Sequence, residues 1–562
     1  MRKGFSMRPK YVTALKTGAL CAAFFLMGTI VADEVSSPLT REIVANAEKL
    51  MGLSFSPAKQ DSMLDGLKDQ LASYRSLRKV ALSNSVPPAI TLNPIPMGMK
   101  FETERKIFAS SSYDKITVPQ NFEDLAFYSV GQLAELLRTR KVTSVQLTTM
   151  YLNRLKKYGP KLECIITLTE ERAMKQARQA DADIAAGQYR SPLQGIPYGV
   201  KDLLSTKGYK TTWGSAAFKD QMIDEDATVV KKLDAAGAVL IAKLTMGELA
   251  WGDVWYGGMT RNPWNYKHGS SGSSAGSASA TSAGLVAFAI GTETWGSIVS
   301  PSTVCGTTGL RPTYGRVSRT GAMALAWSMD KIGPICRTVE DCALVFKAII
   351  GADGKDQTLY DVPFNYNPRI AFKSLRIGYL KKDFDSVKTN RENNDSSFAV
   401  LKQLGFTLVP VELPKLPIND MSIILNAEAG AAFDELVRSG KDDLLVRQIK
   451  DAWPNVFRAS RFIPAVEYLQ ANRVRYLAIQ EMAKLMSLVD IIVAPPFEGD
   501  NSLLTNLTGH PCVVVPNGFT KEGSPTSITF LGKLFDEGTL LAFAKRYQDA
   551  TDFHLKHPKL QE

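Results

Sequence analysis

Along this chain, short runs that are almost entirely apolar alternate with longer stretches in which apolar residues recur at helical spacing. Such runs are typical of strands buried on both faces of a sheet. Helical patterns, for example at 170–187 and 466–485, separate them along the sequence. The alternation predicts an α/β fold, a sheet flanked by helices. The runs that we interpret as strands are 165–167, 198–200, 239–242, 375–379, 489–494 and 511–515.

Several helix starts carry local signals. The segments 129–132 (Ser-Val-Gly-Gln) and 143–146 (Thr-Ser-Val-Gln) both fit capping boxes, and an amphipathic pattern follows each. Further upstream, Ser56 and Pro57 predict an N-cap and a first-turn proline, opening a helix that runs to about Tyr74.

The amino-terminal segment has the composition of a targeting sequence. The first 32 residues contain five cationic side chains and no acid, and their apolar run extends from Ala19 to Ile30. We interpret this segment as a signal peptide, with a short anchor as the alternative, because a membrane span needs about 20 apolar residues. We expect a helical extension at 33–115 and a main α/β domain at 116–562. The protein is then exported, periplasmic or secreted, with membrane proximity only through its amino terminus.

Overall composition excludes several function classes. The net charge is +11, and outside the amino-terminal segment no basic run occurs, so we expect no nucleic-acid partner. The six cysteines are irregularly spaced, which argues against a disulfide framework, although Cys336 and Cys342 are a candidate pair. No spacing of cysteines or histidines indicates a metal site.

Three residues between 201 and 297 make chemical sense together. Lys201 follows a predicted strand, Ser273 lies in a glycine-rich turn before a predicted helix, and Ser297 follows 24 residues later. A serine is a poor nucleophile until a base removes its proton, and a lysine kept neutral by burial can be that base. Taken alone, each residue has an ordinary structural explanation; Asp202, for example, could simply neutralise Lys201.

Two other motifs offer competing chemistry. Residues 272–276 match the nucleophile elbow G-x-S-x-G, with Ser274 at its centre and His510 downstream in the order that a hydrolase triad requires. The segment before the elbow is polar rather than a buried strand, so we rank this alternative second. Residues 328–331 match S-x-x-K, but Gly-Pro follows at once, and we interpret the match as chance.

Four segments together resemble the amidase signature family. They are 194–202 (QGIPYGVKD), 269–318, which ends in CGTTGLRPTYGRVS, 330–334 (DKIGP) and 508–511 (TGHP). The resemblance implies a single α/β/α domain around a mixed β-sheet and a mechanism without a cofactor.

The same resemblance assigns roles to the three residues. It implies that Ser297 is the nucleophile, Ser273 a bridging serine preceded by a cis peptide bond, and Lys201 the ultimate base. It also implies an oxyanion hole formed by the backbone N–H groups of Thr294, Trp295, Gly296 and Ser297.

The chain departs from the family pattern at three positions. Trp295 stands where the family has glycine, Glu293 where it has aspartate, and Val299 where arginine is common. We expect Trp295 to narrow the acyl pocket and to contact the substrate together with Ser274. The arginine missing at 299 removes an expected partner for the acid at 293.

These observations predict an exported serine amidase that hydrolyses a small-molecule or peptide amide to an acid and ammonia or an amine, through an acyl-enzyme on Ser297. Two alternatives stay open. One is the A-type glutaminase component of a tRNA-dependent amidotransferase, and the other is an esterase resembling α/β-hydrolases that uses Ser274.

Overall fold

The computed structural model describes residues 39–561, so the predicted signal peptide or anchor at 1–32 lies outside the described residues. Along the described chain, no helix is both long enough and apolar enough to cross a bilayer. Two compact units divide the chain between Leu82 and Ser83. The domain boundaries that the sequence suggested, after residues 32 and 115, remain predictions.

The amino-terminal unit is built on two helices, α2 (Arg41–Met51) and α3 (Pro57–Leu77). The side chain of Thr40 caps α2, and Gly52 ends it in the left-handed conformation at φ 66°. Helix α3 begins at Pro57, as predicted, although the Ser56 side chain makes no capping hydrogen bond.

The larger unit is organised around one eleven-stranded mixed sheet with the strand order β1-β3-β2-β8-β10-β9-β14-β15-β13-β11-β12. Pairing is parallel within β3-β2-β8 and β13-β11-β12 and antiparallel between the other neighbours. The strands are β1 (Ile165–Leu168), β2 (Pro197–Lys201), β3 (Val239–Leu244), β8 (Phe288–Glu293), β9 (Thr308–Arg311), β10 (Lys331–Cys336), β11 (Ile377–Leu380), β12 (Leu408–Val411), β13 (Ile491–Ala494), β14 (Cys512–Phe519) and β15 (Pro525–Gly532).

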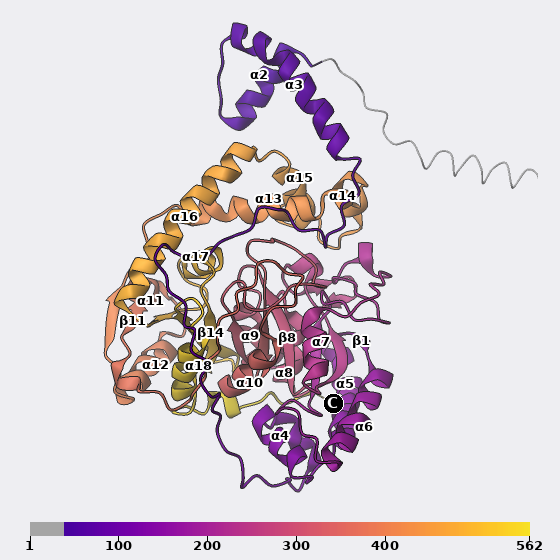
Figure 1. Ribbon diagram of the computed structural model, residues 1–562, viewed down its shortest axis with the longest axis vertical. Helices are drawn as coiled ribbons and strands as arrows, with labels where there is room; N and C mark the ends of the chain where they lie inside the picture. Colours follow the sequence, from indigo (N-terminus) through magenta and orange to yellow (C-terminus); the bar gives the residue numbers. More distant parts are fainter. Residues whose placement is uncertain (1–38, 562) are drawn as a thin grey trace, which may run out of the picture. The chain divides into compact units, whose positions relative to one another are not determined.

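Helices flank this sheet, as the apolar pattern predicted (Figure 1). Helices α8 and α9 contact each other and the central strands, while α10 and α18 contact each other over β9, β10, β14 and β15. Every residue of β2, β3, β8 and β10 is buried, which explains why these strands are mainly apolar although each contains one charged residue. The main helices are α4 (Val130–Arg138), α5 (Ser144–Leu162), α6 (Glu170–Ala185), α7 (Thr228–Ala235), α8 (Ala275–Ser282), α9 (Val299–Cys305), α10 (Val339–Ile349), α12 (Arg391–Gln403), α13 (Ile423–Ala432), α15 (Trp453–Ser460), α16 (Ala465–Leu488), α17 (Asn501–Thr508) and α18 (Glu537–Gln548).

Both predicted capping boxes are confirmed. In α4 the Ser129 side chain accepts from the backbone N–H of Gln132, whose own side chain accepts from the Ser129 backbone, and Thr143 and Gln146 repeat the exchange in α5. Each exchange satisfies two amides that a helix start otherwise leaves without partners.

Residues 83–115 form an extended segment of the larger unit, here called the strap. Its hydrogen bonds attach it to distant parts of that unit: the Arg105 guanidinium contacts both carboxylate oxygens of Asp361 at 3.1 Å, and the Tyr113 hydroxyl donates to Glu340 at 2.9 Å. The backbone N–H of Met97 donates to the Gln480 side chain of α16 at 3.2 Å. The strap is therefore held along its length by side chains of the unit it crosses.

Candidate active site

The site lies where two parallel strands end. Strand β2 ends at Lys201, and its parallel neighbour β8 ends at Glu293, immediately before the loop that carries Ser297. The carboxyl ends of parallel strands meet at one edge of a sheet, which is where α/β proteins bind ligands. The fold thus brings the predicted base and the predicted nucleophile loop to the same edge.

Ser273 reaches this edge from a tight turn. The peptide bond between Gly272 and Ser273 is cis, as the family resemblance implied, and Ser271 adopts a left-handed φ of 58°. A Cβ atom at Gly272 would lie 1.7 Å from the Gly252 carbonyl oxygen, so only glycine fits there. The Ser273 carbonyl accepts from the Gly247 backbone N–H at 3.2 Å, which fixes the turn against its neighbour.

Lys201 is completely buried and surrounded by hydroxyl groups. Its Nζ lies 2.8 Å from Ser273 Oγ, 2.9 Å from Thr292 Oγ1 and 3.2 Å from Ser274 Oγ. Burial lowers the pKa of Lys201 to about 7, against the smaller opposing influence of the Asp330 and Glu293 charges. About half of the lysine is then neutral at pH 7 and able to accept a proton.

Asp202 does not neutralise Lys201. Its carboxylate pairs with the buried Lys243 at 3.0 Å and accepts from the backbone N–H of Thr212 at 2.8 Å. The ordinary structural explanation of Lys201 as a salt-bridged lysine is therefore wrong.

The loop from Thr294 to Ser297 has the properties of an oxyanion hole. Gly296 takes a left-handed φ of 78°, which turns the chain at the start of α9. Among the described residues, no group accepts a hydrogen bond from the four backbone N–H groups of 294–297. Donors that are left free beside a nucleophile can stabilise a negatively charged oxygen.

Two buried carboxylates hold this loop in place. Glu293 accepts from the backbone N–H groups of Ile298 and Val299 at 2.8 and 3.0 Å, and Asp330 accepts from the Thr294 hydroxyl at 2.5 Å. Burial raises the pKa of Asp330. The 294–297 loop is thus fixed at both of its ends.

Glu293 finds its positive partner in Arg311 of β9, 2.8 Å away. Burial by itself would raise the pKa of Glu293, but the Arg311 charge together with hydrogen bonds from Arg311, Asn506 and the Val299 N–H outweighs burial and brings the pKa to about 2. We expected Glu293 to lack a partner because residue 299 is valine. That expectation is wrong, because a different strand supplies the arginine.

The predicted relay is present in part. Lys201 contacts Ser273, but no hydrogen bond joins the Ser273 and Ser297 hydroxyls in the described structure. The two serine segments are tied instead through the backbone, where the Ser274 N–H donates to the Ser297 carbonyl at 3.2 Å. The site-residue roles of Lys201, Ser273 and Ser297 therefore stay proposals.

The predicted substrate contacts differ in accessibility. Trp295, which lies within the 294–297 loop, is 43% exposed, so its side chain is open to a ligand. Ser274 is fully buried, and its Oγ donates to the Thr292 carbonyl at 3.0 Å and accepts from the Thr292 N–H at 3.1 Å. A hydroxyl bonded in this way supports Lys201 and is not placed to touch substrate.

The competing motifs do not form sites. Ser274 has no histidine partner, since the His510 ring bonds to the Thr508 hydroxyl at 2.9 Å. In the S-x-x-K match, the Ser328 hydroxyl donates to Glu428 at 2.6 Å, while Lys331 donates to a backbone carbonyl. The candidate pair of cysteines is not a disulfide, because all five described cysteines are free. No group of metal-ligating side chains occurs within residues 39–561.

Sequence reasoning missed several residues that shape the site. The Thr292 hydroxyl accepts a hydrogen bond from Lys201. Arg311 forms a salt bridge with Glu293, and Lys243 forms one with Asp202. All of them except Lys243 lie in or beside the quoted family segments, so a search for buried polar residues there could have found them.

Comparison with known proteins agrees with this geometry. The Amidase family model matches residues 146–501. The A subunit of glutamyl-tRNA(Gln) amidotransferase from Acinetobacter baumannii is 36% identical over 490 residues, covering 78% of this chain and 99% of that protein. The same-named protein of Carboxydothermus hydrogenoformans is 33% identical over 488 residues, covering 78% of this chain and all of that protein.

Among solved structures, the peptide amidase of Stenotrophomonas maltophilia aligns with a TM-score of 0.69 at 28% identity, covering 78% of this chain and all of the other. The A subunit of glutamyl-tRNA(Gln) amidotransferase from Thermotoga maritima aligns with a TM-score of 0.65 at 25% identity, covering 79% of this chain and all of that one. The chain belongs to the amidase family. It is an amidohydrolase that acts on carbon–nitrogen bonds.

The comparisons correct two predictions. An exported serine amidase is wrong as the main function, because the curated relatives are components of tRNA-dependent amidotransferases. Export is contradicted as well, because the same relatives, named as subunits of glutamyl-tRNA(Gln) amidotransferase, give it no support.

Proposed function

We propose that this chain is the glutamine-hydrolysing component of a glutamyl-tRNA(Gln) amidotransferase. The observation that carries the proposal is the likeness to the A subunit of that enzyme over 78% of this chain and 99% of the relative, with the lysine and both serines at one sheet edge. The substrate is the side-chain amide of glutamine. The products are glutamate and ammonia.

The proposed reaction begins with neutral Lys201. It takes the proton of Ser273, which takes the proton of Ser297, and Ser297 Oγ attacks the amide carbon. The N–H groups of 294–297 stabilise the oxyanion that forms. The proton then returns through the relay to the leaving nitrogen, the C–N bond breaks, and ammonia departs from an acyl-enzyme on Ser297.

Water completes the cycle. The same relay removes a proton from a water molecule, the hydroxide attacks the ester carbon, and Ser297 recovers its proton as glutamate leaves. No cofactor takes part in either half of the proposed reaction.

The release of ammonia indicates which partners the proposed enzyme needs, because another reaction must consume the ammonia. Amidation of glutamate attached to tRNA(Gln) consumes ammonia, and in the proposed complex the other subunits bind and activate that charged tRNA. Nucleic acid is then a partner of the assembly, in contrast to the prediction from this chain's charge alone.

Glutamine hydrolysis by the purified full chain tests the proposal. We expect glutamate release from glutamine, with asparagine and peptide amides as poorer substrates, and loss of activity in Ser297→Ala. A matched control is Ser302→Ala, since Ser302 Oγ is buried in α9 without a hydrogen-bond partner among the described residues. Preference for a peptide amide, or full activity in Ser297→Ala, would overturn the assignment.

A further inference from the structure

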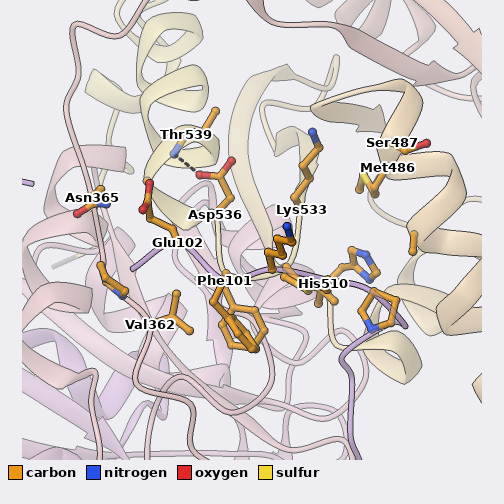
Figure 2. A pocket seen from close by; sticks show the side chains of 18 of the residues that line it. Phe101, Glu102, Val362, Asn365, Met486, Ser487, His510, Lys533, Asp536 and Thr539 are labelled. Carbon is orange, nitrogen blue, oxygen red and sulfur yellow. Dashed lines mark hydrogen bonds between the residues drawn. The ribbon is translucent and has the colours of Figure 1, made fainter. Parts of the chain in front are cut away.

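A cavity of about 840 Å³ lies in the larger unit, away from the residues assigned to catalysis. Its walls come from the strap, from α16 and from the turn that joins β15 to α18 (Figure 2). Lys201, Ser273 and Ser297 do not line it. This volume suits a small organic molecule, since ligand pockets usually measure about 300–1,000 Å³.

Aromatic and apolar side chains form one side of the cavity. The Phe101 ring of the strap meets the Phe535 ring edge-on, with centroids 5.4 Å apart, and Met486 lies on the α16 wall (Figure 2). Phe535 adopts a left-handed φ of 63°, and its N–H is held by Thr313 Oγ1 at 2.9 Å. Residues other than glycine that adopt such a strained backbone conformation tend to cluster at ligand sites.

Most charged groups at the cavity already have partners. Lys533 donates to Asp490 at 2.6 Å, and Lys106 pairs with Glu102 at 3.7 Å and Glu104 at 3.5 Å. Lys100 is exposed at the rim. These ion pairs leave little net charge in the cavity for a ligand to neutralise.

Asp536 forms no salt bridge in the described structure. Its carboxylate caps α18 by accepting from the Thr539 N–H at 3.4 Å (Figure 2), and the Thr539 side chain and the more distant Lys533 charge also favour its ionised form. Burial raises the pKa of Asp536 to about 6, and a bound cation would favour its ionised form. His510, which lines the same cavity, stays neutral, because burial lowers its pKa to about 3.

We propose that this cavity binds a small organic cation, a primary amine carried on an apolar body. The ammonium group would pair with the Asp536 carboxylate, and the apolar body would lie against Phe101 and Phe535. Such a ligand supplies the missing counter-charge and covers apolar surface, two gains that neither an anion nor a neutral molecule combines. The proposal is independent of the amide chemistry, because it concerns other residues.

Isothermal titration calorimetry on the full chain tests this assignment with three probes of similar shape. Phenethylamine is the cation, 2-phenylethanol is the neutral analogue and 3-phenylpropionate is the anion. We expect phenethylamine to bind roughly tenfold or more tightly than either, as a charge-assisted hydrogen bond implies. Equal binding of the alcohol or tighter binding of the carboxylate would overturn the proposal.

Variants separate this cavity from the catalytic site. Asp536→Asn removes the charge yet keeps an N-cap residue on α18, so the helix start is preserved. It should weaken phenethylamine binding at least about tenfold, whereas Asp549→Asn, at the exposed far end of the same helix, should not. Ala483→Phe, which fills the cavity from α16 without changing charge, should abolish binding. Unchanged binding in either Asp536→Asn or Ala483→Phe would refute the assignment.

Discussion

Replacing Arg311 with methionine would remove the positive partner of a carboxylate that holds the oxyanion loop. Both side chains of the Arg311–Glu293 pair are essentially unexposed, 1% and 0%, and their charged atoms are 2.8 Å apart. Removing one partner of a buried pair leaves the other charge uncompensated and costs about 3–5 kcal/mol. We expect the Arg311→Met variant to lose that much stability at pH 7.

The pKa of Glu293 gives an independent magnitude. Its ordinary value of 4.5 falls to about 2 in the folded protein, a difference that corresponds to about 3 kcal/mol. Because the folded pKa is depressed, this stability is present above pH 4.5 and is lost as the pH falls toward 2. The variant should lack this part of the acid dependence.

Urea denaturation at pH 7 and at about pH 3 measures both effects. The double variant Glu293→Gln/Arg311→Met should recover part of the loss, since no buried charge is left unpaired. Arg473→Met, at an exposed arginine, is the matched control and should change stability by less than about 0.5 kcal/mol. A loss below about 1 kcal/mol in Arg311→Met, or no recovery in the double variant, would refute the reasoning.

Four further outcomes are expected. kcat/KM for glutamine should rise with pH through about 7, because protonated Lys201 cannot accept a proton; a profile flat from pH 6 to 8 contradicts this. Thr292→Val, which removes a hydroxyl beside Lys201, should lower kcat about tenfold or more with the melting temperature nearly unchanged; unaltered kcat counts against that contact. Asp202→Asn should cost about 3 kcal/mol in denaturant unfolding by leaving Lys243 unpaired, yet keep the midpoint of the pH profile; a moved midpoint would link Asp202 to the base. Trp295→Gly should preserve the oxyanion N–H and widen the range of amides hydrolysed in a substrate panel, and an unchanged range would remove Trp295 from the acyl pocket.

The sequence carried enough information to predict the layered fold. Buried strands such as β3 and β13 are apolar at nearly every position, and the capping boxes of α4 and α5 are local patterns that need no tertiary information. Strand order is different. Nothing in the local pattern shows that β10 separates β8 from β9, because pairing depends on the whole sheet.

The candidate site shows the same difference between local motifs, which the sequence reveals, and contacts between distant segments, which it does not. Lys201, Ser273 and Ser297 stand in short motifs, so their joint presence was visible. The partnership of Glu293 with Arg311 was not, because the two residues meet across an intervening strand. Valine at 299 suggested a missing partner only because sequence distance was taken for spatial distance.

If Ser297 is the nucleophile, as proposed, the contact of Lys201 with Ser273 has a protective consequence. A neutral amine is a strong acyl acceptor, and one touching an ester on Ser297 would capture the acyl group as a stable amide and end turnover. The Ser273 hydroxyl lies 2.8 Å from the lysine nitrogen. In this position it can transfer a proton between Lys201 and Ser297 and still keep the lysine nitrogen out of contact with the ester. An ester that strayed onto Ser273 would still be hydrolysable. In the proposed mechanism, the intervening serine would both transfer protons and separate the buried amine from the acyl group, so that the amine would not be consumed during turnover.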